Sequence, residues 1–158
     1  MKKEKMNDKG FSLVELIIVI AIMAVLVVVL APQYLKYVER SRNSTDLQNA
    51  TAAVTACQVY AADPQAASSF TANTTFTIAV TNNADAVVDS TDTSTKAAAT
   101  AALEDAAIKL SDLKCKSKTT WTSYTINGKV ETSGSITFTY TNGGGAAATA
   151  FADAMAGK

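Results

Sequence analysis

Hydrophobic and polar positions divide the chain into two unequal parts. Residues 16–31 form an apolar run with no polar side chain, whereas the residues after it mix small, polar and apolar types. As a single α-helix, residues 11–31 would be roughly 30 Å long, which is enough to cross the hydrocarbon core of a bilayer. The pattern therefore predicts an N-terminal membrane-spanning helix followed by one compact domain.

Beyond the apolar run, the pattern predicts that the helix continues through Pro32 and stops at Asp63-Pro64. Its second half carries an apolar stripe at Leu47, Ala50, Val54, Cys57 and Ala61. Strand patterns cover residues 75–81, 120–126, 129–132 and 135–141, and a second helix pattern covers 96–113. Asn127-Gly128 predicts a hairpin turn between two of these strands. The predicted fold class is α+β, with a small antiparallel sheet packed on a long helix.

Residue composition excludes most enzyme chemistry. The chain has no histidine and two cysteines, so it lacks the commonest general base and has few candidate metal ligands. Asp85, Asp89 and Asp92 could be considered for Ca²⁺, but they do not follow the spacing of a known calcium loop and are interpreted as a solvated loop. We expect no enzymatic activity, no metal site and no cofactor.

Charge gives little support to nucleic-acid binding. The 14 basic and 14 acidic residues cancel over the whole chain. Residues 1–10 hold four of the lysines and two of the acids, so their removal would leave a net charge of about −2. This balance lacks the basic character of a dedicated nucleic-acid binder, and no nucleic-acid partner is expected.

Three kinds of N-terminal segment fit a basic stretch before an apolar run. An ordinary secretory signal would be cut near Ala31, but Pro32 is a poor start for a mature chain, and a lipoprotein signal would need a cysteine there. A membrane span remains, with the lysines favouring a cytoplasmic N-terminus. Glu15 does not fit a plain span, because a carboxylate at the centre of a membrane helix costs roughly 2.5–3.5 kcal/mol. An isolated Glu15 would be interpreted as lying near the headgroups.

The residues around Glu15 favour a more specific interpretation. Gly10-Phe11-Ser12-Leu13-Val14-Glu15 resembles the cleavage motif of type IV prepilins and related pseudopilins. The resemblance implies that a prepilin peptidase and N-methyltransferase cuts after Gly10 and methylates the new N-terminus at Phe11. It also implies that Glu15 pairs with the N-terminal amine of a neighbouring subunit during assembly. An amine and a carboxylate are each costly in an apolar core and tolerable together.

The resemblance also predicts organisation and function. It implies the type IV pilin fold, with a leader at 1–10, a transmembrane and polymerisation helix at 11–31, and the rest of the helix plus a globular domain at 32–158. The expected function is a structural pilus subunit that supports adhesion and twitching motility. It would be held in the cytoplasmic membrane and then polymerised into an extracellular helical homo-oligomer by an assembly platform and ATPases. The alternatives are a pseudopilin of a type II secretion or competence system, or a minor tip pilin with a binding role.

Two further predictions concern Pro32 and the cysteines. Pro32 removes a backbone donor, so a helix kink is expected there, and the valine-rich segment before it is predicted to be the weakest part of the helix. A disulfide between Cys57 and Cys115 would close a long loop and stabilise the fold by about 4 kcal/mol. Two free thiols, with Cys57 as a small buried apolar residue, are the alternative.

Overall fold

The computed structural model describes residues 10–66, 68–144 and 149–157. It divides into two compact units, Met1–Val38 and Glu39–Lys158, which are described separately. The predicted leader lies outside the described residues except for Gly10. The domain boundaries at residues 10 and 31 therefore remain predictions.

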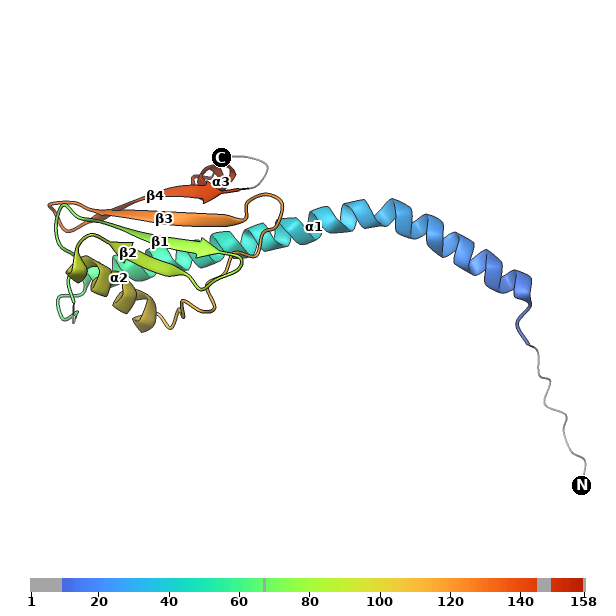
Figure 1. Ribbon diagram of the computed structural model, residues 1–158, viewed down its shortest axis with the longest axis horizontal. Coiled ribbons are helices and arrows are strands. Elements are labelled where there is room, and N and C mark those ends of the chain that lie inside the picture. The colour runs from blue at the N-terminus through green and yellow to red at the C-terminus, as the bar shows by residue number, and fades with distance from the viewer. Residues whose placement is uncertain (1–9, 67, 145–148, 158) are drawn as a thin grey trace, which may run out of the picture. The chain divides into compact units, whose positions relative to one another are not determined.

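Helix α1, Leu13–Ala62, begins in the first unit and ends in the second (Figure 1). In the first unit it runs through Pro32 without a break, so the kink at Pro32 stays a prediction. By length and composition, α1 is the one helix of the described chain that could cross a membrane. The observed helix begins two residues after the predicted start at residue 11. It ends at Ala62, directly before the predicted stop at Asp63-Pro64.

The second unit contains a four-stranded antiparallel sheet in the order β2-β1-β3-β4. The strands are β1 (Thr75–Thr81), β2 (Val87–Ser90), β3 (Ser123–Val130) and β4 (Ile136–Gly143). Helix α2 (Thr93–Asp105) contacts β1 and β2, and helix α3 (Ala150–Met155) contacts β4. This arrangement confirms the predicted α+β class, a long helix with a small antiparallel sheet, which is consistent with the type IV pilin fold.

The core of the second unit lies between the sheet and the C-terminal half of α1. Alternate residues of β1 and β3 point into it, as the strict alternation of burial along both strands shows. The helix contributes mainly small residues, Ala50, Ala53, Ala56 and Cys57, and all are buried. Small side chains let the helix approach the sheet closely, so the large residues of the sheet fill the space. The predicted stripe is shifted, because Leu47 and Val54 are only half-buried.

The predicted hairpin turn at Asn127-Gly128 is wrong. Strand β3 continues through both residues, which pair with Thr77 and Phe76 of β1. Gly128 faces the core, and a Cβ atom there would collide with the ring of Phe76. The glycine is therefore needed for close packing within a strand and not for a turn. The turn lies between Glu131 and Ser135, where Gly134 has a φ of 83°.

Helix α2 is shorter than the predicted 96–113 and begins earlier. It starts after Asp92, whose carboxylate accepts a hydrogen bond of 2.7 Å from the Thr95 backbone N–H. It ends in a Schellman motif in which Ala107 has a φ of 56° and the Ile108 N–H bonds to the Leu103 carbonyl at 2.8 Å. This ending was missed because the residue with positive φ is alanine and not the usual glycine.

Two short elements do not follow from the hydrophobic pattern. Strand β2 lies in a segment that was interpreted as a loop, and its four residues are too few to show a clear alternation. Helix α3 forms in the alanine-rich tail and is held by Phe151, which is fully buried. Its ring stacks on Tyr124 at 4.3 Å and meets Trp121 edge-on at 5.2 Å. Trp121 and Tyr124 are buried core residues of the second unit.

Candidate functional site

The predicted cleavage site lies at the exposed start of α1. Gly10 and Phe11 precede the first helical residue, Leu13, and the Phe11 side chain is 94% exposed. Among the described residues, no atom lies within 4 Å of the position that a Cβ on Gly10 would take. The bond between Gly10 and Phe11 is therefore in non-helical, open backbone, which is the form a peptidase needs to bind its substrate.

Glu15 folds back onto the beginning of the helix. Its Oε2 accepts a hydrogen bond of 2.9 Å from the Ser12 backbone N–H. This N–H is one of the donors that a helix N-terminus leaves without an intrahelical partner, and a carboxylate near it is favoured by the helix dipole. Ser12-x-x-Glu15 thus has the spacing of a capping box, a signal that is visible in the sequence. In the single chain, Glu15 therefore caps the N-terminus of its own helix.

The apolar surface of the first unit has no cover. From Leu13 to Leu30 its large apolar side chains are between 46% and 74% exposed. Full burial of one such side chain is worth about 1.5–3 kcal/mol. The segment therefore needs a bilayer or an assembly of apolar helices around it, which is why the N-terminal helix suggests membrane anchoring.

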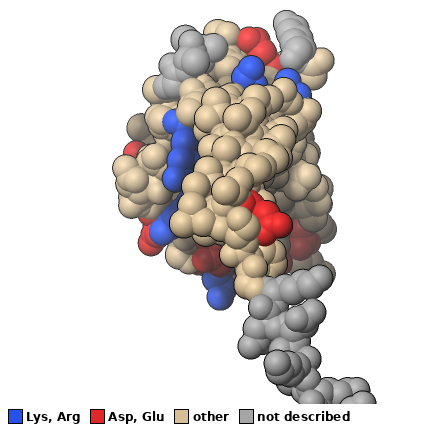
Figure 2. Space-filling model, turned by 90° about the vertical axis from the view of Figure 1, so that its right-hand side faces the viewer, with Lys and Arg blue, Asp and Glu red and all other residues tan. Residues whose placement is uncertain are grey.

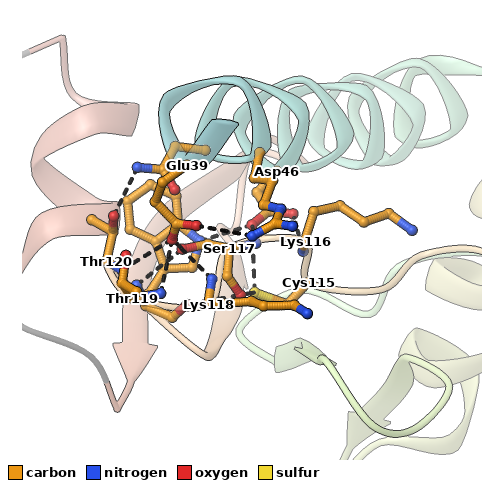
Figure 3. Close-up of polar contacts among 11 residues, drawn as sticks. Glu39, Asp46, Cys115, Lys116, Ser117, Lys118, Thr119 and Thr120 are labelled. Atoms are coloured by element: carbon orange, nitrogen blue, oxygen red, sulfur yellow. Dashed lines mark hydrogen bonds and ion pairs between the residues drawn. The ribbon is translucent and has the colours of Figure 1, made fainter. Parts of the chain in front are cut away.

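A second group of functional polar residues lies where α1 enters the second unit (Figure 3). Glu39 and Asp46 stand two turns apart on one side of the helix and point at residues 115–121, which follow α2. We call these two carboxylates the carboxylate clamp. The only sequence signal for the clamp is the spacing of its two acids, since residues seven apart on a helix share one face.

Glu39 holds the successive backbone N–H groups of the loop. Its Oε1 accepts from the N–H of Lys118 and of Thr119 at 2.8 Å each, from Thr120 N–H at 3.2 Å, and from the Ser117 hydroxyl at 2.7 Å. Successive N–H groups that converge in this way form an anion-binding nest. Burial raises the pKa of Glu39, but these hydrogen bonds outweigh it and hold the pKa well below the usual value.

Asp46 is the buried half of the clamp, with no exposed surface. It accepts hydrogen bonds from Lys116 N–H at 2.7 Å, Ser117 N–H at 2.9 Å and the Trp121 indole N–H at 2.9 Å. A buried carboxylate is tolerated only when its lone pairs are satisfied in this way. The clamp therefore fixes the loop to α1 through bonds that reach about 70 residues along the chain.

The cysteines take the second of the two predicted forms and not the disulfide. Cys57 and Cys115 are both buried free thiols, and Cys115 Sγ lies 3.4 Å from Asp46 Oδ2 in a hydrogen bond to the clamp. Burial raises the pKa of each thiol to about 12. A thiol that stays protonated at neutral pH is a poor nucleophile, so both residues serve packing.

The acidic residues considered for Ca²⁺ have other roles. Asp92 caps α2, while Asp89 and Asp85 form ion pairs with Lys96 at 3.4 Å and with Lys114 at 3.3 Å. Within the described part of the chain, no three His, Cys, Asp or Glu residues are grouped in a way that could hold a metal ion.

Acid should weaken the clamp through Glu39. Because the pKa of Glu39 is lowered in the folded chain, its stabilising effect is present above the ordinary glutamate value of about 4.3 and is lost as the pH falls through the folded value. We expect the free energy of unfolding to fall below about pH 4.3, by up to about 1.4 kcal/mol per pH unit from this group.

Glu39→Gln should reduce this dependence of stability on acid pH, and Glu104→Gln, at an exposed position of α2, should leave it unchanged. Urea unfolding of the full chain in neutral detergent, followed by Trp121 fluorescence at several pH values, measures it. Equal acid slopes for native chain and Glu39→Gln would contradict the assignment.

Comparison with known proteins identifies the N-terminal segment. Residues 5–31 match the family described as the prokaryotic N-terminal methylation motif. The match contains Gly10, Phe11 and Glu15 and ends at Ala31, just before Pro32. No curated protein and no solved structure matches the chain.

Proposed function

Because residues 5–31 carry a prokaryotic N-terminal methylation motif, which supports a type IV pilin- or pseudopilin-like protein, we propose that the chain is a structural subunit of a type IV pilus. The observation that carries the proposal is the position of the motif. Gly10-Phe11 lies in open backbone, and the exposed apolar part of α1 follows within two residues. Adhesion and surface motility would be the functions of the assembled filament.

Cleavage after Gly10 would change the partner of Glu15. The cut creates an α-amine on Phe11, and N-methylation leaves it able to carry a positive charge. The carboxylate that caps the helix through Ser12 N–H at 2.9 Å can then bind an amine of a neighbouring subunit. A charged pair is a stronger interaction than the cap alone in an apolar surrounding. Subunits would thus be brought into axial register by Glu15.

The apolar residues of α1 would supply most of the assembly energy. A helix with exposed apolar side chains all round is stable in a bilayer and in a bundle of identical helices, but not in water. Transfer from the membrane to the filament core exchanges one apolar environment for another. The same segment then serves as anchor before assembly and as polymerisation element after it.

The N-terminus of the protein in sheared cell-surface material tests the proposal. We expect mass spectrometry to find a dominant chain that starts at N-methylated Phe11. Gly10→Leu is the matched control, because a bulky residue before the scissile bond should block cleavage and leave the chain in the membrane. A chain that still begins at Met1 in native cells would refute processing, and with it the assembly mechanism.

A pseudopilin or a minor tip pilin is the second candidate, because the same motif occurs in prepilins and in pseudopilins. Abundance separates the two functions. A mature chain found in membranes and scarce in sheared filaments would favour the pseudopilin or the tip pilin, while a chain that dominates the filaments would favour the major subunit.

A further inference from the structure

A polar groove of about 890 Å³ lies in the second unit beside the carboxylate clamp. Three segments of the chain line it: the start of the packed part of α1, the turn after β1, and the loop after α2. Its charged and polar side chains are Arg42, Lys114, Lys116, Lys118, Asn82, Asn83, Ser41 and Thr45. Nothing in the motif at residues 5–31 accounts for this groove, since the two lie in different units.

The cations of the groove outnumber the anions that they can reach. Lys114 is paired with Asp85 at 3.3 Å, and Arg42 with Glu39 at 3.5 Å. Within the described residues, the amino groups of Lys116 and Lys118 lie within 4.0 Å of no carboxylate. In Figure 2, Lys and Arg atoms lie at several places along one side of the face shown, with Asp and Glu atoms beside the lower ones. An otherwise acidic mature chain thus keeps a local positive surface.

The clamp explains why these charges stay unneutralised. Glu39 and Asp46 are the nearest buried acids, but their oxygens are used by backbone N–H groups of the loop, including those of Lys116 and Lys118. The side chain of Lys116 points away from both carboxylates (Figure 3). The loop is therefore held rigidly by its backbone while its lysine side chains remain free for another partner.

The lysines form a regular row. From Leu113 to Lys118 burial alternates, with Leu113, Cys115 and Ser117 inside and the three lysines on the outer side. Every second side chain of this segment therefore faces outward, which places the three lysines at the groove. Several cations on the outer side of one segment suit a chain molecule with repeated negative groups better than a single small anion.

The remaining lining groups point to a particular class of polyanion. Carboxamides and hydroxyls from Asn82, Asn83, Ser41 and Thr45 can bond to the hydroxyl groups of sugars. The residues that line the groove include no aromatic side chain, so single-stranded nucleic acid would find no surface for stacking its bases.

We propose that the groove lined by Arg42, Lys114, Lys116 and Lys118 binds an acidic polysaccharide, with the lysine row on its carboxylates and the asparagines and hydroxyls on its sugar hydroxyls. On a filament subunit such a site would attach the fibre to an anionic glycan. The site belongs to this chain whether or not it polymerises, so its test does not depend on the proposed filament.

The test uses the full chain in neutral detergent and a fluorescent, short oligogalacturonate as probe. We expect binding at low salt that weakens steeply between about 50 and 200 mM salt, as charge contacts require. Lys116→Gln with Lys118→Gln should weaken binding about tenfold or more, because two unpaired cations are lost. Both side chains are exposed, so the variant should fold, and Trp121 fluorescence checks this.

The matched control is Lys96→Gln with Lys109→Gln, which removes the same charge from exposed positions outside the groove. It should leave binding within about twofold of the native chain. A neutral oligosaccharide of equal length should not bind. Absence of binding to the oligogalacturonate, or an equal loss in both double variants, would overturn the proposal. Tighter binding of a DNA duplex of equal charge would overturn the polysaccharide assignment in favour of nucleic acid.

Discussion

Glu15→Gln is expected to abolish filament assembly while leaving cleavage after Gly10 intact. Glutamine keeps a side-chain oxygen that can accept the Ser12 N–H bond, so the start of α1 should still form. It removes the negative charge, and the amine of the neighbouring subunit would then be buried without a counter-ion. Breaking a buried charge pair in this way costs about 3–5 kcal/mol per subunit, a cost that recurs at every subunit of a filament.

The amount of mature chain in sheared filaments and in the membrane measures this effect. We expect filament yield to fall at least about a hundredfold, in line with 3 kcal/mol or more, while the membrane pool keeps the processed N-terminus. Ser12→Ala is the matched variant, because it retains both the charge of Glu15 and the backbone N–H that Glu15 caps. Normal filaments from Glu15→Gln would show that the carboxylate acts only as a helix cap.

Asp46→Ala is expected to destabilise the second unit strongly. It would leave the N–H groups of Lys116, Ser117 and the Trp121 indole buried without their acceptor. Each buried donor without a partner costs about 1–3 kcal/mol, so we expect the free energy of unfolding to fall by about 3–5 kcal/mol. Urea unfolding should show this, because Trp121 is the only tryptophan of the chain and contacts Asp46 directly.

Asp105→Ala controls for the removal of a carboxylate at an exposed position of α2. Its effect should stay within about 0.5 kcal/mol, as for most surface substitutions. A loss below about 1 kcal/mol for Asp46→Ala would mean that the loop is held mainly by packing of Trp121 against Phe151 and not by the clamp.

The sequence was a good guide where structure depends on neighbours along the chain. The apolar run and the motif around Gly10 identified the N-terminal segment, which the family match confirms. Alternation of side chains gave β1 at its observed bounds, Thr75–Thr81. Helix α1 was predicted to Ala62, because Pro64 disfavours helical backbone at the residue before it.

The sequence was a poor guide where a residue's role depends on a distant partner. Asn127-Gly128 was interpreted as a turn because the local pattern favours one, but the ring of Phe76 needs a residue without Cβ at that place in the strand. The sequence left a disulfide between Cys57 and Cys115 open beside two free thiols. Burial and the hydrogen bond from Cys115 to Asp46 leave them as thiols.

The sequence by itself therefore determined the apolar N-terminal helix, the N-terminal methylation motif and the fold class, because each depends on contiguous or periodic residues. Only the tertiary structure decided that Glu39 and Asp46 bind a loop about 70 to 80 residues away, and that Lys114, Lys116 and Lys118 form one row beside a groove. The physical reason is that the partners of a carboxylate or a lysine are set by which segments the packed core brings together. Spacing along the chain does not reveal these contacts, because they form only when the sheet packs against α1.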